Sequence, residues 1–183
     1  MISNIINTKF DKAKIIEPKC FEDERGYFFE SFNQKEFKQK VDDKINFIQD
    51  NQSLSKKNTL RGLHYQIKKT QAKLIRVLEG KIFDVFVDLR KSSKLFGKWQ
   101  GVILSSENKY QLYIPKGFAH GYFVKSDIAI ISYKTSDFWY PEHERTILWN
   151  DKDLNINWGN NLPPIISEKD QCGLPFNQSS FFK

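Results

Sequence analysis

The segment from Ile82 to Leu89 constrains the fold more than any other part of this chain. Its residues alternate between two faces of an extended backbone, with Phe83, Val85, Val87 and Leu89 on one and Ile82, Asp84, Phe86 and Asp88 on the other. A period of two residues is the signature of a β-strand. The turn residues Glu79-Gly80 precede it, and Lys73–Val77 before them is predicted to form another strand.

Short runs of this kind recur along the chain. Further strands are predicted over Trp99–Leu104, Tyr110–Ile114, Tyr122–Val124, Ile128–Lys134 and Thr146–Trp149. Helix signals are few: Asn33 followed by Glu36 predicts a capped helix over Gln34–Lys40, and Ser167–Asp170 predicts the start of another. Many short, evenly spaced strands favour a mainly β fold, an antiparallel jelly-roll barrel with a few short peripheral helices.

Length and charge narrow the classes of protein further. The 183 residues fit one domain spanning 1–183, and a hydrophobic share of 39% indicates a globular chain. The net charge of +7 favours anionic partners, but the lysines are scattered, which argues against nucleic acid. No run approaches the roughly 20 apolar residues of a membrane span, and charged residues interrupt the first 14 positions. We therefore expect a soluble cytoplasmic protein, with no membrane association and with Cys20 and Cys172 as free thiols.

Only three histidines are present. His64 follows Arg61-Gly62, and taken alone it is better interpreted as a core or turn residue, because a single histidine is weak evidence for catalysis. Strict alternation puts Arg61 and His64 on opposite faces of a strand, whereas a bulge at Gly62 would re-aim one of them. His120 lies in a Pro- and Gly-containing segment that suggests a tight turn, and His143 lies in a charged segment that suggests an exposed turn. Since the histidines match no metal-ligand spacing, no metal is assigned.

Two polar segments and one tyrosine also bear on the prediction of a site. Asp23 to Gly26 is a turn entering a strand, or it presents Arg25 to an anion beside aromatic residues. Gln49-Asp50-Asn51 alone indicates a turn. Tyr133 shares a face with Ala129 and Ile131, so it is predicted to point into the barrel, where its phenol stays protonated.

The order and spacing of these segments resemble the dTDP-4-dehydrorhamnose 3,5-epimerase family. The resemblance runs from about Ile15 to Asp170, and its main stretches are Phe21–Ser31, Gln49–Asn51, Leu60–Gln66, Gln71–Leu74, Phe83–Val85, Asp88–Arg90, Gly117–Gly121, Tyr133-Lys134 and Ser167–Asp170. It implies a cupin-type jelly roll, usually a homodimer, with no metal and no organic cofactor. The implied substrate is a nucleotide-diphosphate sugar, dTDP-4-dehydro-6-deoxy-D-glucose, which is epimerised at C3 and C5.

The resemblance also implies a role for each matching residue. His64 is the general base, Asp170 orients it, Tyr133 is the proton donor on the opposite face, and Lys73 stabilises the enolate oxygen. Arg25 and Arg61 hold the diphosphate, with Arg25 supplied by the neighbouring subunit. The nucleotide contacts Glu30, Gln49 and Asn51, and further binding positions are His120, Glu144 and Lys169.

The chemistry explains these residue types. The protons at C3 and C5 both flank the C4 ketone, so removing either gives an enolate, which a fixed cation stabilises. Inversion requires a base on one face of the sugar and an acid on the other. Two alternatives stay open: a C3 or C3/C5 epimerase of a GDP-4-keto-6-deoxyheptose, and a non-catalytic nucleotide-sugar-binding jelly roll. Trp139 stands where many family members carry tyrosine, which keeps an aromatic wall but removes a hydroxyl, so the fine shape of the sugar or base pocket stays open.

Overall fold

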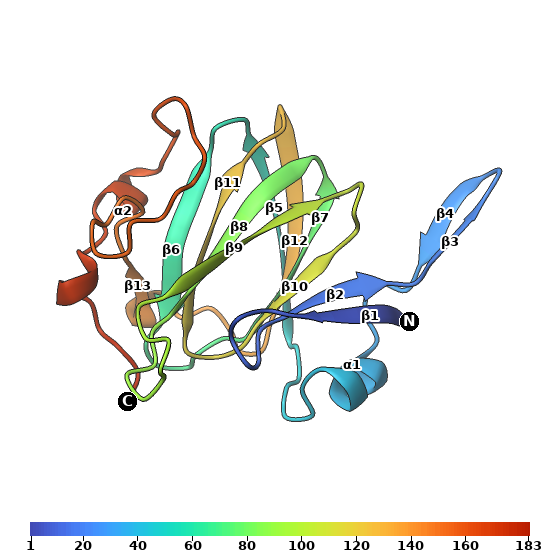
Figure 1. Ribbon diagram of the computed structural model, residues 1–183, viewed down its shortest axis with the longest axis horizontal. Helices are drawn as coiled ribbons and strands as arrows, with labels where there is room; N and C mark the ends of the chain where they lie inside the picture. Colours follow the sequence, from blue (N-terminus) through green and yellow to red (C-terminus); the bar gives the residue numbers. More distant parts are fainter.

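Two antiparallel sheets face each other and form a jelly-roll barrel in the computed structural model of residues 1–183 (Figure 1). In spatial order, the six-stranded sheet contains β1 (Ile2–Asn7), β2 (Lys14–Pro18), β10 (Gln111–Ile114), β7 (Lys73–Glu79), β12 (Ile128–Thr135) and β5 (Gln49–Lys56). The five-stranded sheet contains β13 (Glu144–Thr146), β6 (Leu60–Gln66), β11 (Phe118–Val124), β8 (Lys81–Asp88) and β9 (Trp99–Ser105). The predicted mainly β fold class is confirmed.

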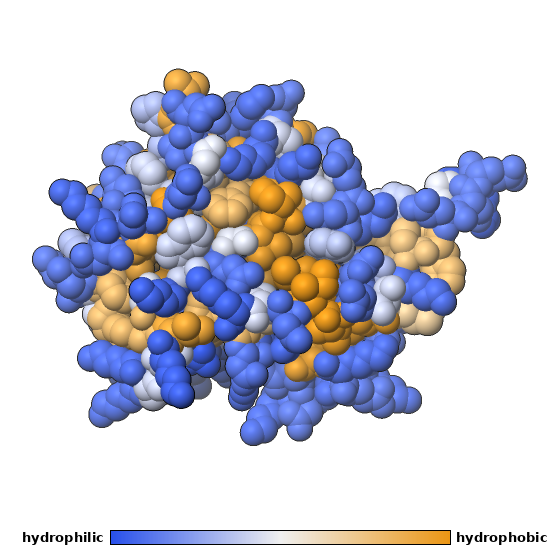
Figure 2. Space-filling model, viewed as in Figure 1, coloured by the Kyte–Doolittle hydropathy of each residue, from blue (hydrophilic) through white to orange (hydrophobic).

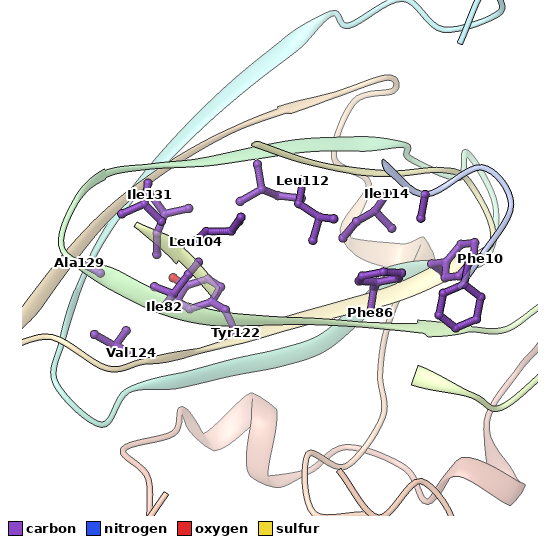
Figure 3. Packing of buried hydrophobic residues seen from close by; sticks show 14 residues of the cluster. Phe10, Ile82, Phe86, Leu104, Leu112, Ile114, Tyr122, Val124, Ala129 and Ile131 are labelled. Carbon is purple, nitrogen blue, oxygen red and sulfur yellow. The ribbon is translucent and has the colours of Figure 1, made fainter. Parts of the chain in front are cut away.

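Alternation along β8 divides its side chains between two cores, as predicted. Ile82 and Phe86 lie between the two sheets, where they pack with residues such as Leu112 and Ile131 (Figure 3). Val85 and Val87 point to the other side of the five-stranded sheet, where the C-terminal part of the chain covers them. The same alternation places polar residues of β8 inside the barrel.

Both short helices start at the caps that the sequence predicts. α1 spans Gln34–Lys40, and the backbone N–H of Glu36 donates to the side chain of its N-cap residue Asn33 at 3.1 Å. α2 spans Glu168–Gln171, and Ser167 caps it by accepting from the backbone N–H of Asp170 at 3.2 Å. Two 3-10 turns, η1 (Pro141–His143) and η2 (Phe176–Gln178), complete the elements.

Three predictions of local structure are wrong. The strand predicted over Thr146–Trp149 ends at Thr146, because the backbone beyond it pairs with the C-terminal segment: the N–H of Leu148 donates to the carbonyl of Leu174 at 3.0 Å. Gln49–Asn51 begins strand β5 instead of forming a turn. His120 lies within β11 and is only 8% exposed. His143 does lie in a turn, η1, but its side chain is half-buried.

A hairpin of β3 (Cys20–Asp23) and β4 (Gly26–Phe29) projects from the base of β2, away from the barrel (Figure 1). It carries exposed aromatic residues, with Tyr27 57% and Phe28 70% exposed, and its apolar groups are visible beside the polar tip in Figure 2. Contiguous exposed apolar patches mark interaction surfaces, whereas apolar side chains exposed singly are normal. None of the helices has the length and apolar character needed to cross a bilayer.

Candidate active site

Four of the predicted site residues, His64, His120, Lys73 and Tyr133, come from strands of the two facing sheets. His64 on β6 and His120 on β11 are directly paired across neighbouring strands, so their side chains share the inner face of the five-stranded sheet. Lys73 and Tyr133 come from β7 and β12 of the opposite sheet. One sheet thus carries the two histidines, and the facing sheet carries an ammonium and a phenol.

A bulge at Gly62 brings Arg61 to the same face as His64. Arg61 pairs with Tyr122 and His64 with His120, so three steps along β6 match two along β11. Gly62 has a φ of +122°, and a Cβ there would lie 2.5 Å from the Cα of Gly121. Only glycine fits so close an approach of two backbones. The bulge that the sequence permitted is therefore present.

His64 is held by a buried carboxylate. Its Nε2 lies 2.5 Å from Oδ1 of Asp170, whose other oxygen accepts from the backbone N–H of Gly62 at 3.3 Å. Burial raises the pKa of Asp170, but its bonds to His64 and Gly62 outweigh this effect and hold the pKa below its ordinary value. Asp170 is therefore a carboxylate at neutral pH, and it accepts the Nε2 proton of His64. In neutral His64 the free lone pair is then on Nδ1.

Lys73 and His120 are two further ionisable side chains whose pKa values are lowered by burial. Burial lowers the pKa of Lys73 to about 8, although Asp84 and Glu144 oppose the shift. His120 Nε2 lies 3.0 Å from both carboxylate oxygens of Asp84, which is completely buried. Burial also lowers the pKa of His120, against the opposing effect of Asp84.

Tyr133 lies near a second tyrosine and a guanidinium. Burial raises the pKa of Tyr133, and Tyr122 adds to the shift while Arg61 opposes it, so the phenol is protonated at neutral pH. Arg61 donates from Nε to Ser55 Oγ at 3.1 Å, and that same hydroxyl lies 3.2 Å from the hydroxyl of Tyr122. These contacts hold the guanidinium beside Ser55 and near the hydroxyl of Tyr122.

Glu144 links the histidine site to an exposed aromatic residue. Its Oε2 accepts from Lys169 Nζ at 2.5 Å and from the indole N–H of Trp139 at 3.3 Å. Burial raises the pKa of Glu144, but Lys169 and the neighbouring His64 bring it below the ordinary value. Trp139 itself is 56% exposed.

Glutamine side chains anchor the backbone around Trp139. Gln49 accepts from the backbone N–H of Trp139 at 3.1 Å and donates to Asn51 at 2.9 Å. Gln66 accepts from the N–H of Tyr140 at 2.8 Å. The indole is therefore displayed at a fixed place beside two of the predicted nucleotide-binding residues.

Arg25 and Glu30 are not brought to this site within one chain. Arg25 lies in the turn of the projecting hairpin, where its side chain is 85% exposed and pairs only with Asp23. Glu30 follows that hairpin and bonds to the N-terminal amine of Met1 at 2.7 Å and to Asn33. Both residues lie on or beside the one element that leaves the barrel.

Asp84 is a polar residue of the barrel interior that was not predicted as a site residue from the sequence. The available signal was an inward carboxylate on a strand whose other residues are mostly apolar. A fully buried carboxylate requires partners, but the identity of His120 as the partner depends on the pairing of β8 with β11. No three His, Cys, Asp or Glu side chains gather as a metal site.

Comparison with known proteins points to a single family. The family model described as dTDP-4-dehydrorhamnose 3,5-epimerase matches residues 7–178. The dTDP-4-dehydrorhamnose 3,5-epimerase of Shigella flexneri is 53% identical over 180 residues, which is 98% of this chain and 99% of that protein. The crystal structure of the Legionella pneumophila dTDP-6-deoxy-D-glucose-3,5-epimerase, in complex with dTDP-4-keto-L-rhamnose, has a TM-score of 0.94 and 49% identity, covering 97% of this chain and 94% of that one.

A more distantly related enzyme is described as an epimerase of a single carbon. A 3'-monoepimerase from Streptomyces bikiniensis, in complex with dTDP-quinovose, has a TM-score of 0.86 and 29% identity, covering 92% of this chain and 85% of that one. The shared barrel thus occurs in both double and single epimerases.

Proposed function

Because this chain belongs to the dTDP-4-dehydrorhamnose 3,5-epimerase family, we propose that His64, Asp170, Lys73 and Tyr133 carry out its epimerisation. The protein is a cofactor-independent isomerase. The proposed reaction inverts C3 and C5 of dTDP-4-dehydro-6-deoxy-D-glucose within one domain, residues 1–183. Support for this reaction comes from His64 on one sheet, which is bonded to Asp170 of α2, and from Tyr133 on the facing sheet.

The first step is proton removal by His64. Asp170 accepts the Nε2 proton, which leaves the Nδ1 lone pair to take a proton from the carbon beside the ketone. The C–H bond breaks, its electron pair forms the C–C double bond of an enolate, and the ketone π electrons move onto the C4 oxygen. The carboxylate then stabilises the imidazolium that forms.

Lys73 stabilises the enolate oxygen. Its ammonium lies among inward residues of both sheets, where water is scarce and a fixed positive charge acts strongly on a developing negative one. The ketone carries little charge before proton removal, so this interaction strengthens mainly in the transition state. Such differential stabilisation raises kcat.

Tyr133 returns a proton from the opposite face. Its protonated phenol donates to the carbon as the enolate collapses to the ketone, which gives the inverted centre and a phenolate. The positive charge of Arg61 acts to lower the pKa of Tyr133, and so it favours that phenolate. Solvent then removes the proton from His64 and restores the one on Tyr133, and the same residues act in turn at C3 and C5.

The nucleotide is proposed to bind around Trp139. Gln49 and Asn51 supply amide groups beside the exposed indole, and Arg61 supplies a guanidinium that a diphosphate requires. The indole offers a flat surface on which a nucleobase can stack. Further proposed substrate contacts are His120, Glu144 and Lys169.

A homodimer in the cytoplasm completes the proposal, with Arg25 and Glu30 acting in the partner's site. The projecting hairpin supports it, since Tyr27 and Phe28 are 57% and 70% exposed and Arg25 has no partner beyond its own turn. A cation displayed on such an arm suits a diphosphate bound to a second copy.

Proton NMR in heavy water tests the reaction. Purified protein is given dTDP-4-keto-6-deoxyglucose or a GDP-4-keto-6-deoxyheptose, and exchange at C3 and C5 is followed. We expect exchange at both carbons of the dTDP sugar, abolished by His64→Ala and retained by the matched control His143→Ala. Exchange at C3 alone would indicate a single epimerase, a preference for the GDP sugar would reject the dTDP assignment, and no exchange with either would favour a binding protein.

Subunit mixing tests the role of Arg25. His64→Ala and Arg25→Ala proteins are each expected to be nearly inactive. After unfolding and refolding together, heterodimers combine an intact His64 in one chain with an intact Arg25 in the other, so about a quarter of the wild-type activity should return. No recovery would show that Arg25 does not act across an interface.

A further inference from the structure

The pair formed by His120 and Asp84 has a geometry that no step above uses. Asp84 is completely buried on the inner face of β8, and both of its oxygens lie 3.0 Å from Nε2 of His120. Its carboxylate therefore binds one ring nitrogen of the histidine, and that nitrogen must carry the proton.

The rest of the His120 ring faces away from Asp84. The side chain keeps 10% of its surface exposed, whereas that of Asp84 keeps none. His120 is also paired across the strands with His64, on the face of the sheet where the base acts. The free edge of the ring, with Nδ1, is thus available to a sugar bound between the sheets.

The charges around His120 favour its neutral form. Burial, Lys73 on β7 and His64 on β6 all lower the pKa of the ring, and Asp84 on β8 is the group that opposes them. With Nε2 protonated and the ring neutral, Nδ1 is a hydrogen-bond acceptor. An acceptor repels a ketone or enolate oxygen, which Lys73 can bind instead, but it suits a hydroxyl.

We infer that Asp84 is a positioning residue that fixes His120 as an acceptor for a ring hydroxyl of the bound sugar, at C2 or C3. The identity of the ligand rests on the proposed function. The arrangement divides recognition between two groups: Lys73 selects a carbonyl oxygen, and His120 selects a hydroxyl beside it. Sugars without that hydroxyl leave a buried acceptor unpaired, which is a strong basis for rejection.

Nitrogen-15 NMR of the substrate-free protein tests the positioning and needs no turnover. At pH 7.5 we expect His120 to show a protonated Nε2 and an unprotonated Nδ1, with the signals assigned by their loss in His120→Gln. In Asp84→Asn the amide can donate to Nε2, so the ring should shift towards the Nδ1-protonated form. A wild-type ring that is doubly protonated, or protonated at Nδ1, would overturn the inference even if the enzyme is an active epimerase.

Kinetics with 2-deoxy and 3-deoxy analogues of the dTDP sugar identify the hydroxyl, with exchange at C5 as the readout. One analogue should lower the wild-type kcat/KM about tenfold. For His120→Phe we expect kcat/KM on the parent sugar to fall by a similar factor, with no further fall on that analogue. His120→Gln should again distinguish the two sugars, because its amide oxygen can accept from the hydroxyl. Asp84→Asn should no longer distinguish them. An equal loss on all three sugars in His120→Phe would overturn the inference. Absence of wild-type exchange on the parent sugar would instead reject the proposed function, and the NMR result would still decide the position of the lone pair.

Discussion

Replacing Asp170 by asparagine tests the central contact of the site with little change in shape. Asparagine keeps an oxygen for the backbone N–H of Gly62 but loses the charge that fixes the proton on Nε2 of His64. Its amide can instead donate to Nε2, which moves the proton of His64 to Nδ1 and removes the base. We expect kcat for exchange at C3 and C5 to fall by about 10²–10⁴, or roughly 3–5 kcal/mol in the barrier.

Stability should change less than catalysis, and in a pH-dependent way. The variant loses a charge-assisted bond, so we expect about 1–3 kcal/mol less unfolding free energy near pH 7. The pKa of Asp170 is lower in the folded chain than in the unfolded one. Its contribution is therefore complete above the unfolded value of about 4 and disappears as the pH falls through the folded value, so the two proteins should converge in acid.

The assays are deuterium exchange followed by NMR and denaturant unfolding at several pH values. Asp151→Asn is the matched control, because Asp151 is also a buried carboxylate, and it accepts from the backbone N–H groups of Leu154 and Phe176, away from the histidines. The control should lose stability and keep its kcat. If Asp170→Asn retains near wild-type exchange while remaining folded, then the assignment of His64 as the general base and of Asp170 as the residue that orients it is wrong.

Three further substitutions give separable outcomes. Lys73→Met should lower kcat about 10²–10³-fold with a small change in KM. Because the pKa of Lys73 is about 8, wild-type kcat/KM should also decline as the pH rises through that value. A pH–rate profile of the variant that keeps this decline would contradict the role of Lys73. Tyr133→Phe should still exchange protons at C3 and C5 but form little inverted product, and chromatography of the products checks this; normal inversion would assign the acid elsewhere. Gly62→Ala should cost about 2–4 kcal/mol of unfolding free energy, because its Cβ would lie 2.5 Å from Gly121 and 2.8 Å from the carbonyl of His120 at a positive φ; a denaturant midpoint near wild type would show that the strands can separate at little cost.

Strands with an apolar face were predictable, and polar edge strands were not. β8 alternates apolar residues on both faces, and its bounds differ from the prediction by one residue at each end. β5 contains Gln-Asp-Asn-Gln-Ser-Leu-Ser-Lys, and its inward residues Ser53 and Ser55 meet the hydroxyl of Tyr122 instead of an apolar core. Such a strand has no hydrophobic period, so only its pairing with β12 reveals it.

Glycine next to His120 misled the local interpretation for a physical reason. A Cβ at Gly121 would lie 2.7 Å from the carbonyl of Arg61. The residue is therefore required where β11 approaches the bulge of β6, and it does not mark a turn. This requirement depends on the contact between Gly121 and Arg61, which are far apart in the sequence, so it cannot be predicted from a local sequence pattern. Resemblance, in contrast, selected His64, Asp170 and Lys73 together; the structure bonds His64 to Asp170 and places Lys73 on the facing sheet.

His64 and Tyr133 come from opposite sheets, so the distance between the sheets sets the distance between the proposed base and the proposed acid. Facing sheets lie about 10 Å apart, and the apolar side chains between them set that spacing. If the sugar ring takes protons from one wall and receives them from the other, then larger or smaller residues at Phe86 or Ile131 change the proton-transfer distance. Phe86 pairs across the strands with His120, so apolar substitutions beside these polar residues would then alter the ratio of exchange to inversion before they alter the fold.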